Sequence, residues 1–377
     1  MQTILKIAWS NSFQNKKRTL SAISGISFSI LLVFLQLGFL GATKKGATLL
    51  YDSFDFDIAI VSEAYQFLAV APTIDRIRLI QAQMDPDVES IFSLNVSSAR
   101  WVDSATQLES TALLIGLDDK PDFINNKALR EGYLALGNGL EGVLDNYSHR
   151  DYGPLEVGRT GLINQVETQI SALFSLGMFF FGDGAVALNM GNYTRLSGRS
   201  SNELSAGLVR VKAGQDPNVV VERLRAFLPS DVLVYTKRGL QEMERGYFVS
   251  VKPIGIMFQL AVGVALTVGV VILYQVLATE LANRMNEFAT LKAMGFGPSA
   301  IYGIGATQSV IFILLSFLPA LLIAMGLFRL IFSVSKLPMA MTFGLAQLVL
   351  IMSLIMCLIS SVLAMGRVRK ADPADLF

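Results

Sequence analysis

Four segments of this chain are long, strongly apolar and almost free of charged side chains. A helix that crosses the hydrocarbon core of a bilayer, which is about 30 Å thick, needs roughly 20 consecutive apolar residues. Each segment reaches that length, and together they span residues 20–42, 254–278, 300–328 and 342–365. This pattern predicts an α-helical membrane protein with four transmembrane helices.

Charged residues are concentrated between the first two apolar segments, although the whole chain is only 16% charged. A soluble domain carries about 25%. Residues 43–252 are numerous enough to form a core of their own. Strand-like patterns at 57–61, 111–116, 207–211 and 232–235, and helix-like patterns at 73–84 and 218–227, alternate within them. We therefore expect a large α+β extracytoplasmic domain, inserted between transmembrane helices 1 and 2.

A fifth apolar run, residues 172–181, is too short to cross a membrane and ends at a Gly-Asp-Gly turn. We expect it to form one or two buried strands. The alternative is that Phe179, Phe180 and Phe181 contact lipid or an apolar cargo.

The short flanks of the four segments carry an uneven charge that predicts their orientation. Positive residues gather at the N-terminus, between the second and third segments, and at the C-terminus: Lys6, Lys16, Lys17, Arg18, Arg284, Lys292, Arg367, Arg369 and Lys370. The opposite short loop, around residues 333–341, offers only Lys336, although Lys44 and Lys45 oppose the trend. Both termini are therefore expected in the cytoplasm. The first segment is longer than a signal-peptide core, so we expect an uncleaved anchor.

Several functional classes are disfavoured by the residues present. The net charge is +1, so no bulk attraction to nucleic acid is expected. One cysteine and one histidine are too few for a zinc site. The chain has no phosphate-binding P-loop motif and no nucleophile elbow, and we interpret the segment around His149 as a polar surface loop. We therefore expect no catalytic site, no metal and no directly bound cofactor.

Two cytoplasmic segments have helical patterns. Residues 1–19 favour an amphipathic helix at the membrane surface with Trp9 at the headgroups, although a plain polar tail is the alternative. Residues 279–298 favour a short amphipathic helix that stops at Gly295 and leads through Pro298 into the third segment. From the residues alone, this second helix is equally compatible with a passive connector and with a functional element.

The 279–298 segment carries the residues of a known motif. Its Arg-x-x-Glu-x-Ala-x-Leu-Lys-Ala-Met-Gly run, and the Arg-Lys and Pro-Ala-Asp residues of the 366–377 tail, resemble the FtsX/MacB-type permeases of ABC transporters. The layout of one span, a large outside domain and three further spans is also similar. The resemblance extends to DevC-type permeases of cyanobacterial glycolipid exporters, through Ala8-Trp9, residues 16–19, residues 57–62 and Tyr65.

This resemblance implies a mechanical role in the inner membrane. Residues 279–298 would be the coupling helix that docks on a separate ATP-binding subunit, present in two copies and carrying the ATP-Mg. The expected contact residues are Arg284, Glu287, Phe288, Leu291, Lys292, Met294 and Gly295. The other implied partners are a periplasmic adaptor and a TolC-like outer-membrane channel, with a lipid or glycolipid-like cargo. The alternative is an FtsX-like subunit that transports nothing and regulates a periplasmic cell-wall enzyme.

Small residues recur four apart in the first segment, at Ser21, Gly25 and Ser29. Such spacing lets helices approach closely. It predicts either the seam of a homodimer or packing within one subunit, and the sequence leaves both open.

Overall fold

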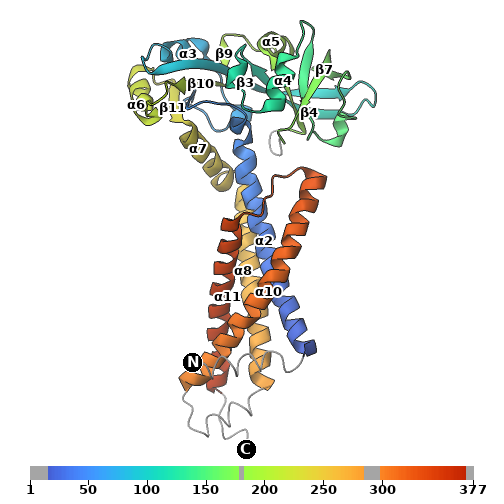
Figure 1. The fold of residues 1–377 in the computed structure, drawn as a ribbon, viewed down its shortest axis with the longest axis vertical. Helices are drawn as coiled ribbons and strands as arrows, with labels where there is room; N and C mark the ends of the chain where they lie inside the picture. The colour runs from blue at the N-terminus through green and yellow to red at the C-terminus, as the bar shows by residue number, and fades with distance from the viewer. Residues whose placement is uncertain (1–15, 178–181, 284–297, 371–377) are drawn as a thin grey trace, which may run out of the picture. The chain divides into compact units, whose positions relative to one another are not determined.

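The computed structural model describes residues 16–177, 182–283 and 298–370 (Figure 1). These residues form two compact units. The helical unit contains the described parts of Met1–Ala42, Pro253–Ser335 and Met339–Phe377. The sheet unit contains Thr43–Lys252 and Lys336–Pro338.

Within the described ranges, four helices are long and apolar enough to cross a membrane, as the sequence predicts. They are α2 (Lys16–Asp52), α8 (Pro253–Asn283), α10 (Pro298–Ser335) and α11 (Phe343–Lys370). Regular helix extends beyond the predicted segments. It continues ten residues past position 42 in α2, covers 329–335 of the predicted 329–341 loop in α10, and reaches Lys370 of the predicted tail in α11.

Small and polar side chains hold the helical unit together. The Ser27 hydroxyl donates to the Ser316 carbonyl of α10 at 3.0 Å, and the Ser360 hydroxyl of α11 donates to the Val270 carbonyl of α8 at 2.9 Å. Gly38 is needed for close approach, because a Cβ atom there would lie 2.3 Å from the Phe328 ring. In lipid, van der Waals packing and hydrogen bonds of this kind drive helix association.

The sheet unit is built on a nine-stranded sheet in the order β11-β1-β10-β3-β4-β8-β5-β7-β6. Its strands are β1 (Ile58–Ser62), β3 (Val88–Asp103), β4 (Glu109–Leu117), β5 (Glu141–Asp145), β6 (Thr160–Ile163), β7 (Val166–Phe174), β8 (Gly184–Asn189), β10 (Ala206–Val211) and β11 (Val232–Thr236). A separate pair joins β2 (Ile74–Asp75) to β9 (Glu203–Leu204). The four predicted strands are confirmed as β1, β4, β10 and β11.

The long strand β3 closes part of the sheet into a ring. Its first half pairs with β10, and its last residues, Trp101–Asp103, pair with Ile163–Gly161 of β6. Strands β3, β4, β8, β5, β7 and β6 therefore form a closed circuit of six. One buried cluster takes side chains from all six strands and includes Trp101. Of the run 172–181, which was predicted to form buried strands, residues 172–174 form the end of β7, residues 175–177 follow it without regular structure, and residues 178–181 lie outside the described part.

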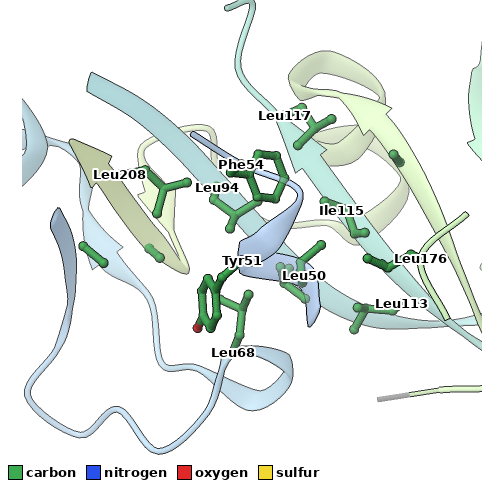
Figure 2. Close-up of a cluster of buried hydrophobic side chains, with 14 of the residues drawn as sticks. Leu50, Tyr51, Phe54, Leu68, Leu94, Leu113, Ile115, Leu117, Leu176 and Leu208 are labelled. Atoms are coloured by element: carbon green, nitrogen blue, oxygen red, sulfur yellow. The ribbon is translucent and has the colours of Figure 1, made fainter. Parts of the chain in front are cut away.

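Helices and short helical turns cover the sheet: α3 (Arg76–Ala82), α4 (Lys127–Leu134), α5 (Met190–Ser197), α6 (Pro217–Phe227), α7 (Lys237–Ser250), η1 (Leu68–Val70), η2 (Pro121–Phe123) and η3 (Arg150–Tyr152). The predicted helices at 73–84 and 218–227 are confirmed as α3 and α6. Figure 2 shows part of the largest core cluster, where Leu50 and Tyr51 from the end of α2, and Phe54 just after it, lie among strand side chains.

Candidate coupling site

The predicted coupling helix lies outside the described residues. The structure describes its flanks: α8 ends at Asn283, and α10 begins at Pro298, the position that suits proline in the first turn of a helix. Seven predicted contact residues fall between these two points and stay predictions: Arg284, Glu287, Phe288, Leu291, Lys292, Met294 and Gly295. The predicted N-terminal surface helix, residues 1–19, is described only from Lys16 onward, as the start of α2.

The stripe of small residues on α2 packs partly within its own chain. A Cβ atom on Gly25 would lie 3.5 Å from Ile272 of α8, and the buried Ser29 lies beside Gly269 of the same helix. The Ser29 hydroxyl donates to the Gly25 carbonyl at 3.1 Å. Ser21 is exposed. Gly25 and Ser29 thus contact α8 within one subunit, and the dimer seam at Ser21, Gly25 and Ser29 stays a prediction, with Ser21 as its exposed member.

Ser21→Leu is therefore the substitution that tests the dimer seam. If α2 helices pair along this stripe, we expect about fivefold less crosslinked dimer, because a bulky side chain there removes close helix packing worth about 1 kcal/mol. Gly25→Leu would also disturb Ile272 in the same chain. Crosslinking in membranes is the measurement, with Thr267→Leu on an exposed face of α8 as the control. Equal dimer yields would place the seam elsewhere.

Three segments of the sheet unit continue in sequence into apolar helices. They are the end of α2, the helix α7 that precedes α8, and residues Lys336–Pro338 between α10 and α11. Within the sheet unit, α7 and α2 are joined by Arg245, which donates to the Thr48 hydroxyl at 3.2 Å, and by Gln241, which donates to Asp52 at 3.0 Å. These segments are the candidate coupling elements among the described residues.

A buried carboxyl group lies where α2 and α7 meet. Glu244 of α7 is fully buried, and its Oε1 atom accepts hydrogen bonds from the Tyr51 hydroxyl at 2.5 Å and from the Leu68 N–H at 3.1 Å. The Tyr65 hydroxyl donates to the same oxygen and contacts the Tyr51 hydroxyl. Hydrogen bonds to one carboxyl oxygen thus connect α7 to α2 and to the loop after β1.

Burial controls the ionisation of this group. Removal from water raises the pKa of Glu244 from 4.5 to about 7, against the hydrogen bonds from Tyr51, Tyr65 and the Leu68 N–H, which act to lower it. Burial and the nearby Glu244 carboxylate raise the pKa of Tyr65 well above 10. Tyr65 therefore remains a neutral hydrogen-bond donor at ordinary pH.

Sequence reasoning missed Glu244 because α7 was not predicted. Helix α7 begins after Thr236, whose hydroxyl accepts from the Gly239 N–H at 3.1 Å in an N-cap. Its buried face consists of Leu240, Glu244 and Phe248, four residues apart. A glutamate in the middle of an i, i+4, i+8 apolar stripe is the signal that could have identified it.

The Lys336–Pro338 segment has its own contacts within the sheet unit. The Lys336 ammonium lies 5.4 Å from the centre of the Tyr147 ring, a cation–π distance. The loop beneath it is organised by the buried Asp145, which accepts from the backbone N–H groups of Tyr147, Leu176 and Gly177. Burial raises the pKa of Asp145, in opposition to these three bonds.

The segment around His149 has the geometry of a surface loop. The exposed His149 ring pairs with Asp151 at 3.0 Å, and the Ser148 hydroxyl instead donates to the Asp145 carbonyl at 2.7 Å. Serine and histidine therefore do not form a nucleophile–base pair here. Among the described ranges, no group of three or more His, Cys, Asp or Glu side chains is placed to hold a metal ion.

Comparisons with known proteins concern both units. Residues 260–373 match the family model of the FtsX-like permease C-terminal region. This range includes the motif at 284–295. With the four apolar helices, it indicates a membrane protein that carries an FtsX-like permease region. No curated protein sequence matches the chain.

Two solved structures are similar to parts of the chain. One is the periplasmic region of MacB from Actinobacillus actinomycetemcomitans, at 10% identity and a TM-score of 0.36, covering 51% of this chain and 94% of that one. The other is the extracellular domain of the noncanonic ABC-type transporter YknZ from Gram-positive bacteria, at 10% identity and a TM-score of 0.34, covering 48% of this chain and 98% of that one.

Proposed function

We propose that this chain is the membrane-spanning permease subunit of an ATP-driven ABC exporter. It contributes no ATPase chemistry, and it transmits motion from a separate ATP-binding subunit, present in two copies, to its extracytoplasmic domain. The observation that carries the proposal is the match of residues 260–373 to the FtsX-like permease region, in a chain with four apolar helices.

The described residues supply a mechanical route for such a subunit. Helix α2 is unbroken from Lys16 to Asp52, and only Val251 and Lys252 separate α7 from α8. A continuous helix transmits displacement along its axis with little loss, since each residue is tied by hydrogen bonds to the next turn. Movement of the apolar helices would therefore reach the Tyr51–Glu244 contact directly.

The wider assembly follows from the family resemblance. We propose a homodimer in the inner membrane with both termini cytoplasmic, joined by a periplasmic adaptor and a TolC-like outer-membrane channel. Export of a lipid or glycolipid-like cargo, as in DevC-type permeases, is the preferred transport role. Regulation of a periplasmic cell-wall enzyme by an FtsX-like subunit is the competing one.

The test is the ATPase activity of the ATP-binding subunit co-purified with this chain or with Glu287→Lys. If residues 279–298 are the coupling helix, the charge reversal is expected to weaken association at least about tenfold or to uncouple activity, because one partner of an interfacial charge pair is inverted. Glu156→Lys makes the same charge change at an exposed position of the sheet unit and should leave activity unchanged.

Equal binding and activity for wild type and Glu287→Lys would contradict the coupling role. The same preparation separates the two biological roles. Capture of an adaptor protein by the wild-type complex supports export, whereas capture and activation of a cell-wall hydrolase supports regulation.

A further inference from the structure

The carboxyl group of Glu244 is unevenly satisfied. Its Oε1 atom accepts from Tyr51, Tyr65 and the Leu68 N–H. Its Oε2 atom is equally buried and has no hydrogen-bond partner among the residues the structure describes. An ionised carboxylate offers acceptor positions on both oxygens, and a buried oxygen without a donor is costly. A proton on Oε2 removes the negative charge while the three donors on Oε1 keep their places.

Among the residues that the structure describes, no cation pairs with this carboxylate. Arg245, the next residue on α7, is turned to the Thr48 hydroxyl of α2. On the α2 side, Asp52 is paired with Lys45 at 2.5 Å. Lys252 lies over the rings of Phe67 and Tyr247, at 4.6 and 5.4 Å from their centres. Tyr51 and Tyr65 are the titratable groups that contact Glu244, and both act as neutral donors. Proton binding is therefore the available way to neutralise the site.

The strength of the contact depends on that proton. Hydrogen bonds to an ionised acceptor are roughly twice as strong as those between neutral groups. With Glu244 ionised, the bonds from α2 and from the loop after β1 are strong, but the buried charge is expensive. With Glu244 protonated, the charge penalty disappears and the three bonds weaken. Because burial raises the pKa of Glu244 despite these bonds, the cost of the buried charge outweighs the gain in bond strength, and the protonated form favours the closed contact.

We propose that Glu244 is a proton-operated latch within the sheet unit: the protonated carboxyl group holds α7 against Tyr51 of α2 and against the Tyr65–Leu68 loop, and loss of that proton to solvent, which leaves a buried charge with Oε2 unpaired, loosens that hold. The latch senses pH on the side of the membrane where the sheet unit lies. It goes beyond the permease role, because it requires neither a particular cargo nor a particular partner.

Supporting this reading, burial brings the pKa of Glu244 to about 7, so that small changes around neutral pH alter its charge. The donors come from α2, the loop after β1 and η1, which are separated from Glu244 by 193, 179 and 176 positions of sequence. The end of α2 and helix α7 are both continuous in sequence with apolar helices. Loosening the contact between α2 and α7 therefore weakens the mechanical coupling between these two helices.

The experiment uses the full chain in lipid nanodiscs. Hydrogen exchange of the Leu68 amide and of α7 is followed from pH 8 to pH 5.5, corrected for the intrinsic pH dependence of exchange. In the wild type we expect exchange to rise by about fivefold to tenfold from pH 5.5 to pH 8, because ionisation of the buried carboxyl group favours the opened form. In Glu244→Gln, which keeps the shape and cannot ionise, exchange should not change with pH.

Glu242→Gln is the matched control, since Glu242 lies on the same helix, is exposed and pairs with Arg238. It should respond to pH like the wild type. Superimposable curves for the wild type and Glu244→Gln would overturn the proposal, as would loss of the pH response in Glu242→Gln.

Infrared spectroscopy gives an independent readout of the proton itself. Acidification of the wild type should produce the carbonyl band of a protonated carboxylic acid, absent in Glu244→Gln. In Tyr65→Phe, the midpoint of that band should move to higher pH, because the ionised form loses a donor. A wild type without this band, or a midpoint unmoved in Tyr65→Phe, would contradict the latch even if Glu244→Gln folds poorly.

Discussion

Trp101→Ala is expected to lower the free energy of unfolding of the sheet unit by about 3–5 kcal/mol. Trp101 is fully buried at the point where β3 meets β6, and its ring stacks on Tyr152 with centroids 5.1 Å apart. Gly161 of β6 lies so close to the indole that a Cβ atom there would be 2.2 Å from it. Truncation leaves a large cavity next to the pairing that closes the six-stranded ring.

Calorimetry of the full chain in nanodiscs measures this effect as a fall in the melting temperature of the sheet unit, of roughly 10 °C. Leu108→Ala, at a half-exposed position in the turn between β3 and β4, is the control and should change stability by less than about 1 kcal/mol. If Trp101→Ala and the Leu108→Ala control have the same melting temperature, closure of the ring contributes little to the stability of the sheet unit.

Glu244 is expected to make the sheet unit less stable as pH rises from about 4.5 to 8. Because the folded-state pKa is raised from 4.5 to about 7, the folded state binds the proton more tightly than the unfolded chain does. The stabilisation of the folded state by this proton is fully present below pH 4.5 and is lost as pH rises through about 7. The difference between the two pKa values corresponds to about 3 kcal/mol in the free energy of unfolding.

The measurement is urea unfolding of the wild type and of Glu244→Gln at several pH values between 5 and 8. The difference between the two curves isolates Glu244, because Asp145, whose pKa is also raised by burial, is present in both proteins. Carboxylates with lowered pKa values, such as Asp85, lose their stabilising effect at more acidic pH. A constant difference between the two proteins over this range would contradict the prediction.

The sequence predicts the apolar helices well because a long charge-free run in lipid is stable as an α-helix, in which the backbone hydrogen bonds are satisfied within the segment. The extension of α2 was missed because Lys44 and Lys45 resemble a membrane boundary. In the structure both lysines are exposed, while Ala47, Leu50 and Tyr51 follow at helical spacing and are buried. The helix therefore changes its surroundings without changing its conformation, which a hydropathy pattern does not reveal.

The longest strand was not predicted, although apolar and polar residues alternate from Phe92 to Ser97 within the 16-residue strand β3. Ser93, Asn95 and Ser97 are buried as well, so both faces of this part of the strand are covered. Asn95 accepts from the Ser205 N–H at 3.0 Å, a contact across 110 positions of sequence. The ring closure and the Glu244 contacts depend on such distant partners, which no local pattern identifies.

Closure of the ring also determines where the main sheet could join another sheet. In the described chain, β6 pairs with both β7 and β3, so β11 is left as the outer strand of the nine. The guanidinium of Arg225 donates to the Val234 carbonyl of this strand at 2.8 and 3.0 Å. A side chain of α6 that occupies a carbonyl group of the outer strand covers part of that edge and discourages edge-to-edge pairing. Copies crowded on one membrane face can thus stand close together without their sheets fusing into aggregates.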